Sequence, residues 1–75
     1  MLQENTRVRI NSHREGVKKH WNGLTGTITG HHFALMALPD FRDKNKIVYH
    51  IEFDKPKDGQ TGVGLREFEL EVLND

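Results

Sequence analysis

The most constraining feature of the chain is the alternation of side chains over Lys46–Asp54. Large apolar residues recur at every second position there, and His50, Glu52 and Asp54 place polar groups between or after them. A period of two puts successive side chains on opposite faces of a β-strand. We therefore predict a half-buried strand whose inner face carries Ile47, Tyr49, Ile51 and Phe53.

Shorter segments predict further strands. Val8 and Ile10 alternate with polar neighbours, so both should face inward from a first strand. Three glycines in Gly23–Gly30 suit a sharply bent strand in which larger side chains would crowd. These additional strands are predicted at residues 6–11, 23–30, 61–65 and 71–73, the last returning beside the first.

The connecting segments carry turn signals. Ser12–Asn22 breaks the alternation with polar residues and is predicted to be a long loop, and residues 55–60 are predicted to be a turn. Residues 66–70 are predicted to form a helical or 3-10 turn near the C-terminus. That turn would plug one end of the fold with Phe68 and Leu70.

Residues 31–45 are compatible with a hairpin, a loop or a short helix. Phe33–Leu38 has a helix-forming composition, but it is short and Pro39 would end a helix before it. The turn-forming residues that follow are equally typical of a hairpin. We favour one long loop or extended hairpin over residues 29–46.

These elements predict a single all-β domain over residues 1–75, since a chain of this length supports one core. No helical period is long enough to cover a sheet, and an open sheet would leave one face bare. Rolling the sheet onto itself buries that face and removes the edges. The expected fold is a small barrel of about five strands.

In this order the segments resemble the SH3-like barrels. Gly23–Ile28 matches the G-x-x-G-x-[VI] element of the KOW-type modules of transcription and ribosomal proteins. Leu65–Glu71 is similar to the F-x-x-x-E-L-E ending of small electron-transport accessory proteins. That group includes photosystem I reaction-centre subunit IV, the variable chain of ferredoxin–thioredoxin reductase and the nitrile hydratase β subunit. The resemblance implies a five-stranded SH3-like barrel that binds RNA, DNA or protein.

The composition excludes several classes. There is no cysteine, so disulfides and thiolate metal sites are excluded. No apolar run approaches the ~20 residues of a membrane span, and no signal-peptide pattern is seen, so we expect a soluble cytoplasmic protein that avoids membranes. The net charge is zero, but residues 1–50 carry eight Lys or Arg against four acids, and residues 51–75 carry three against seven. This segregation is a weak indication of a basic patch.

Catalytic and metal-binding patterns are lacking. Ser12 and His13 are neighbours, but no nucleophile elbow or third partner accompanies them, so we predict no catalytic residues. Neither the H-E-x-x-H motif nor paired ligand spacing is present, and adjacent His31 and His32 would point to opposite faces of a strand. We therefore predict neither a metal site nor a cofactor. The solvent-facing histidines are then His13, His20, His31, His32 and His50.

Two segments remain as candidate binding surfaces. Apolar residues in the 33–41 segment, together with the sole tryptophan, would form a protein interface. That set is Phe33, Leu35, Met36, Leu38, Phe41 and Trp21. Cations in and near the Arg14–Asn22 loop, with the same tryptophan as a stacking face, would instead bind nucleic acid. That set is Arg7, Arg9, Arg14, Lys18, Lys19, His20 and Trp21.

A structural role for either segment is also open: Trp21 would pack across the barrel end, and the apolar loop would fold back on the core. Zero net charge favours the protein interface over nucleic acid. The sequence thus predicts a non-enzymatic binding module, a small accessory or regulatory protein that docks on a protein partner or larger complex. It would act as a monomer or as a subunit of a hetero-complex. The alternative is a KOW-like protein that binds RNA or DNA.

Overall fold

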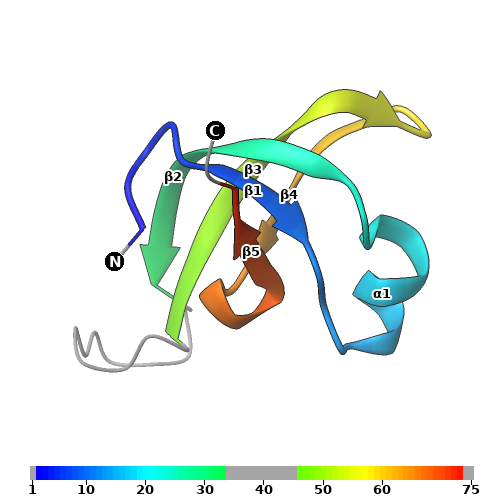
Figure 1. Ribbon diagram of the computed structural model, residues 1–75, viewed down its shortest axis with the longest axis horizontal. Helices are drawn as coiled ribbons and strands as arrows, with labels where there is room; N and C mark the ends of the chain where they lie inside the picture. Colours follow the sequence, from blue (N-terminus) through cyan, green and yellow to red (C-terminus); the bar gives the residue numbers. More distant parts are fainter. Residues whose placement is uncertain (1, 34–45, 74–75) are drawn as a thin grey trace.

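The predicted strands assemble into one antiparallel sheet in the computed structural model, which describes residues 2–33 and 46–73 (Figure 1). The strand order is β4-β3-β2-β1-β5. The elements are β1 (Arg7–Ile10), α1 (Glu15–Trp21), β2 (Thr25–Phe33), β3 (Ile47–Lys57), β4 (Gln60–Leu65), the 3-10 turn η2 (Glu67–Glu69) and β5 (Leu70–Val72). The all-β, five-stranded architecture and the C-terminal 3-10 turn are confirmed. Because β4 and β5 are the two ends of this order, a closed SH3-like barrel stays a prediction.

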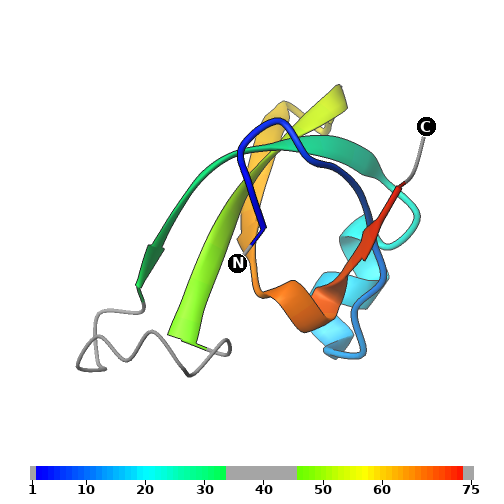
Figure 2. The same cartoon turned by 60° about the vertical axis from the view of Figure 1, so that its left-hand side comes forward.

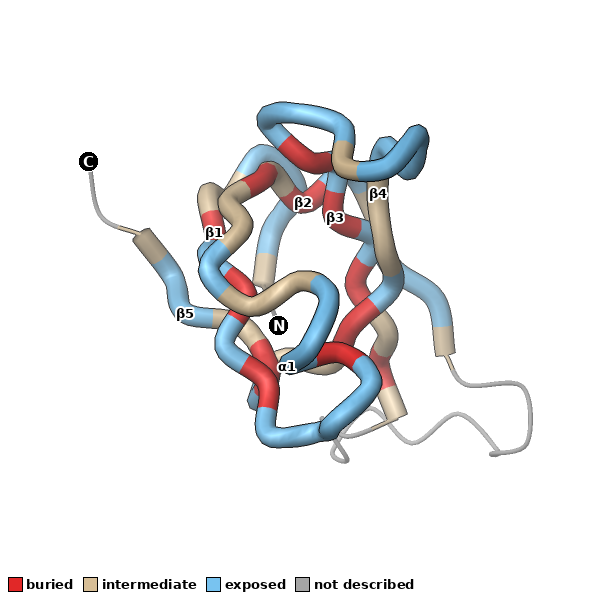
Figure 3. The backbone as a smooth tube through the Cα atoms, turned by 90° about the vertical axis from the view of Figure 1, so that its right-hand side faces the viewer, coloured by how far each residue is buried: buried red, intermediate tan, exposed pale blue. Residues whose placement is uncertain are grey.

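The sheet curves around a core built from the predicted inner faces (Figure 2). From Ile47 to Asp54 of β3, buried positions alternate with exposed or half-buried ones (Figure 3). Val8 and Ile10 of β1 are also buried, so both inner-face predictions are confirmed. Among the described residues, the buried apolar side chains are Val8, Ile10, Val17, Ile28, Ile47, Tyr49, Ile51, Phe53 and Leu65.

The return of the chain beside its own beginning is confirmed as well. β5 pairs antiparallel with β1, and Ile10 lies opposite Leu70 in the ladder. On its other side β1 pairs with β2, where Val8 lies opposite Gly26. A Cβ atom at Gly26 would lie 2.4 Å from the backbone oxygen of Glu52, so β2 and β3 approach closely only because this residue is glycine.

The loop predicted at Ser12–Asn22 is wrong, because Glu15–Trp21 forms an α-helix. Val17 is buried, and Trp21, one turn later, packs against the core. Glu15 in the first turn and three basic residues in the last turn complement the helix dipole. A seven-residue helix spans only two turns, so its period is too brief to recognise in the sequence.

The turn predicted at residues 55–60 is shorter than expected. β3 continues to Lys57, β4 begins at Gln60, and these two residues pair. Asp58 and Gly59 both have positive φ, which is the conformation of a type I′ hairpin turn. Part of the extended hairpin is also present, since β2 runs to Phe33 and pairs with β3 there. The rest of that prediction, at 34–45, lies outside the described residues.

The predicted plug of the fold is partly wrong. Leu70 packs against the core, but Phe68 is 57% exposed. The residue of η2 that points inward is instead Glu69, which is fully buried. In residues 2–33 and 46–73 no helix is long and apolar enough to cross a membrane.

Candidate functional site

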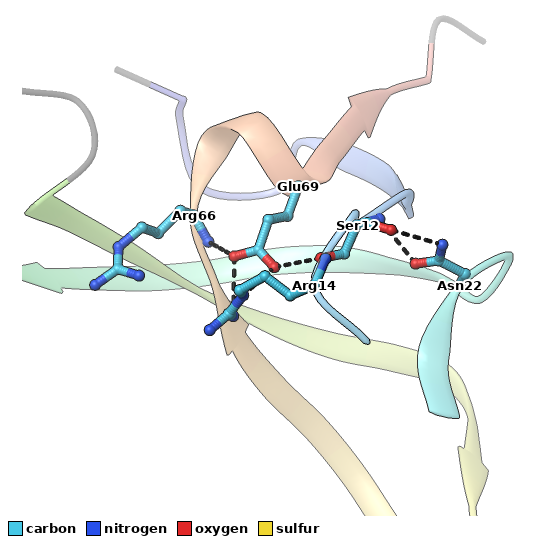
Figure 4. A network of polar contacts seen from close by, with 5 residues as sticks. All are labelled: Ser12, Arg14, Asn22, Arg66 and Glu69. Carbon is cyan, nitrogen blue, oxygen red and sulfur yellow. Dashed lines mark hydrogen bonds and ion pairs between the residues drawn. The ribbon is translucent and has the colours of Figure 1, made fainter. Parts of the chain in front are cut away.

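The buried carboxylate of Glu69 is the centre of a polar network between the two ends of the chain (Figure 4). Ser12 Oγ donates to Glu69 Oε2 at 2.7 Å, and Arg14 donates from Nε to Oε2 at 2.9 Å and from Nη2 to Oε1 at 3.0 Å. The backbone N–H of Arg66 donates to Oε1 at 3.2 Å. Each carboxylate oxygen therefore accepts two hydrogen bonds, which satisfies a group that would be costly to bury alone.

These contacts keep Glu69 ionised. Burial by itself raises the pKa of the carboxyl, but hydrogen bonds from Arg14, Ser12 and the Arg66 backbone outweigh it. The pKa of Glu69 is consequently lower than its ordinary value.

Asn22 extends the network to the end of α1. Its Oδ1 accepts from the Ser12 N–H at 2.8 Å, and its Nδ2 donates to the Ser12 carbonyl at 3.0 Å. The Ser12 hydroxyl also accepts from the Arg14 N–H at 3.1 Å. Ser12 is only 2% exposed, so a substrate does not reach its hydroxyl. The network therefore joins β1, α1 and η2 structurally and does not resemble a catalytic centre.

Three arginines of the predicted nucleic-acid set pair with acids from the second half of the chain. Arg7 binds Asp54 through two hydrogen bonds, of 2.5 and 2.6 Å, and Arg14 binds Glu69. Arg9 Nη1 lies 3.8 Å from an oxygen of Glu71. The charge segregation along the sequence is thus partly cancelled in space. β1 pairs with β5, which carries Glu71 and follows Glu69, and Asp54 lies two strands away on β3.

The Arg7–Asp54 pair also perturbs the carboxyl. The hydrogen bond from Arg7, aided by one from Thr25 Oγ1 at 2.6 Å, holds the pKa of Asp54 well below its usual range. The pair is solvent-exposed, so its main effect is to occupy the Arg7 guanidinium.

The other members of that set lie on α1. Lys18, Lys19 and His20 are exposed in its last turn, and the His20 carbonyl accepts a hydrogen bond from Lys57. The ring of Trp21 is half-buried against the core and lies 5.8 Å from the ring of His20. The structural role considered for Trp21 is therefore present, and only part of its ring is available for stacking.

The predicted protein-binding set is only partly described. Phe33 is half-buried and packs against the core, with its ring 6.4 Å from that of His31. It ends β2, whereas Trp21 ends α1, and these ends lie on opposite sides of the molecule in Figures 1 and 2. The structure therefore does not bring Phe33 and Trp21 together. Outside the described residues are Leu35, Met36, Leu38 and Phe41.

Two exposed apolar side chains were not predicted from the sequence. Among the described residues, the large hydrophobic side chains that are exposed are Phe68 in η2, at 57%, and Val72 in β5, at 44%. We call these two residues, which belong to consecutive elements near the C-terminus, the C-terminal apolar patch. In the sequence, a glutamate precedes each of the two apolar residues: Glu67 precedes Phe68, and Glu71 precedes Val72. No other feature of the sequence marks these two residues as exposed.

The neighbouring His31 and His32 lie on different faces of the sheet. His31 is adjacent to the rings of Tyr49 and Phe33, whereas His32 faces His50. Within the part of the chain that the structure describes, no group of three or more His, Cys, Asp or Glu side chains is arranged to hold a metal ion.

Comparison of the chain with protein-family models, curated proteins and solved structures finds no match in any of the three. The fold and the geometry of its surfaces therefore carry the functional argument. They define a small all-β protein with an internal ion-pair network, an exposed apolar patch and a basic helix end.

Proposed function

We propose that this chain is a non-enzymatic binding module, a small accessory protein of the cytoplasm that docks on a protein partner. The observation that carries the proposal is the exposure of Phe68 and Val72 in the C-terminal apolar patch. Partially exposed aromatic and aliphatic anchors with a polar rim are typical of protein interfaces. The strand order and the 3-10 turn before the last strand also support the SH3-like barrel class proposed from the sequence.

The position of Val72 strengthens this argument. It lies opposite Val8 in the β1–β5 ladder, so the two side chains share one face of the sheet. Val8 is fully buried, whereas Val72 remains 44% exposed because β5 is the terminal strand of the sheet. A partner that covers this edge would extend the existing core rather than create a separate contact.

The patch indicates an apolar contact on the partner. Phe68 and Val72 are its exposed side chains, whereas Glu71, the neighbour of Val72 on β5, lies opposite Arg9 on the other face of the strand. A complementary partner therefore presents an apolar anchor to these two side chains.

Nucleic-acid binding is the second candidate, supported by the exposed Lys18, Lys19 and His20 on α1. Its weakness is that Arg7, Arg9 and Arg14 are engaged with carboxylates. Two lysines contacting phosphates would give a log–log salt slope of only about −2 on duplex DNA.

The test compares two double variants in affinity capture. Phe68→Ser with Val72→Thr removes the apolar patch, and Lys18→Gln with Lys19→Gln removes the helix charges. We expect to find a protein that is retained by the wild type and by the lysine variant but is lost by the patch variant. A protein retained equally by the wild type and the patch variant would exclude this surface.

The nucleic-acid candidate is tested by amide NMR titration with single- and double-stranded DNA and RNA at about 50 mM salt. We expect no localised shifts. Shifts confined to Lys18–Trp21 that disappear at about 300 mM salt would instead make the second candidate the function.

A further inference from the structure

A pair of histidines from neighbouring strands meets on the outer face of the sheet. His32 Nδ1 of β2 lies 2.5 Å from His50 Nε2 of β3, and the ring centroids are 4.8 Å apart. Both side chains are exposed. The two nitrogens share a hydrogen bond, so one ring donates and the other accepts.

A β-bulge creates this pair. Ile28 lies opposite Ile51 and Gly30 lies opposite His50, so Thr29 is an extra residue in β2. The extra residue reverses the alternation of the strand beyond it. His31 is consequently opposite Tyr49 on the core side, and His32 moves to the outer face with His50.

The register brings the two rings within reach of each other. Gly30 is the residue directly opposite His50, and His32 is the diagonal neighbour two positions further along. A Cβ atom at Gly30 would make ordinary van der Waals contact with His50 Nδ1, at 3.8 Å, so the pair does not depend on this glycine. The ring of His32 leans across the ladder toward His50.

We propose that His32 and His50 form a two-histidine binding site for a divalent transition-metal ion such as Zn²⁺. Neutral imidazole is a preferred ligand of Zn²⁺, with a bond of about 2.0–2.1 Å. A tetrahedral ion holds two such nitrogens about 3.3 Å apart, so the exposed rings need to separate by less than about 1 Å. Water completes the coordination.

The proton balance of binding is simple. The proton shared between His32 Nδ1 and His50 Nε2 is released to solvent, and the far nitrogen of the donating ring takes one up. Both imidazoles remain neutral, and both facing nitrogens offer lone pairs to the ion. Access is open, because both histidine side chains are exposed. A groove of about 440 Å³ lies beside His50 and is also lined by Thr29 and Glu52, but it does not include His32. Glu52 lies two positions from His50 on the same face of β3 and adds negative charge on this side of the sheet.

The first test is a Zn²⁺ titration followed by ¹H–¹⁵N spectra of the histidine rings. The rings of His32 and His50 should shift together, while those of His13, His20 and His31 stay in place. Shifts distributed evenly over the five histidines, or none at millimolar Zn²⁺, would overturn the proposal.

The second test measures Zn²⁺ affinity by calorimetry in three variants. His32→Gln and His50→Gln should each lower the affinity by at least about tenfold, since even groups that only support a metal ligand contribute that much. His31→Gln is the matched control, because His31 is adjacent in sequence but lies on the Tyr49 side. An equal loss in His31→Gln would contradict the site. The readout is the metal itself, so either result leaves the docking proposal unaffected.

Discussion

Replacing Glu69 by Gln tests the polar network directly. The change preserves side-chain volume but removes the charge and replaces one acceptor oxygen with an NH₂ group. That group would face donors, because Ser12, Arg14 and the Arg66 N–H all point at the carboxylate. The expected result is a large loss of folding free energy without a cavity.

The magnitude follows from the burial and the partners. Breaking a fully buried ion pair by removing one member costs about 3–5 kcal/mol. Arg14 is 52% exposed at its side chain, so water compensates it in part, and we expect a loss of about 2–4 kcal/mol. A chain of 75 residues has a total stability of about 4–11 kcal/mol, so this loss is a large fraction.

Urea unfolding followed by the fluorescence of Trp21, the sole tryptophan, measures the change. With a slope near 1 kcal/mol per molar, the midpoint should fall by about 2–4 M. Glu71→Gln is the matched control, since Glu71 is exposed and lies 3.8 Å from Arg9, and it should shift stability by less than about 0.5 kcal/mol. Equal effects of the two substitutions would refute the reasoning about burial.

Three further predictions concern acid stability, backbone packing and the core. The pKa of Glu69 is lowered in the folded state, so ionised Glu69 stabilises the fold above the unfolded-state pKa of about 4.3, and this stabilisation is lost as the pH falls below that pKa. The stability of Glu69→Gln should therefore fall less steeply with acid than that of the wild type. Gly26→Ala should destabilise the fold by about 1–3 kcal/mol, because the new Cβ atom would meet the Glu52 backbone. Gly16→Ala in α1 should stabilise it by about 0.4–1 kcal/mol, because the new Cβ atom meets nothing within 4 Å. Denaturant midpoints that shift in the same direction in both variants would contradict this. Ile51→Ala should cost about 2–5 kcal/mol in urea unfolding, and a cost below about 0.5 kcal/mol would contradict its burial in the core.

Local sequence pattern predicted the sheet well. The face of β3 that carries Tyr49 and Ile51 is buried, and so are Val8 and Ile10 of β1. These positions follow from the two-residue period of a strand, which any short window of sequence displays. The fold class was therefore predictable even though α1 was missed.

The arrangement of charge was not predictable in the same way. Arg14 and Glu69 are 55 residues apart, and Arg7 and Asp54 are 47 apart, so each pairing exists only once the strands are ordered. The histidines show what local pattern can predict and what it cannot. Alternation correctly separated His31 from His32, but the partner of His32 depends on the bulge at Thr29 and on the register of β2 with β3.

By itself, then, the sequence determined which residues of each strand face inward, because steric alternation is a local property of the backbone. Tertiary structure alone decided that Glu69 is buried while Phe68 is exposed, although the two are neighbours in one 3-10 turn. A carboxylate enters the interior only where donors from distant segments replace its hydration, and here Ser12 and Arg14 come from the opposite end of the chain. The arrangement of those donors is a property of the assembled sheet.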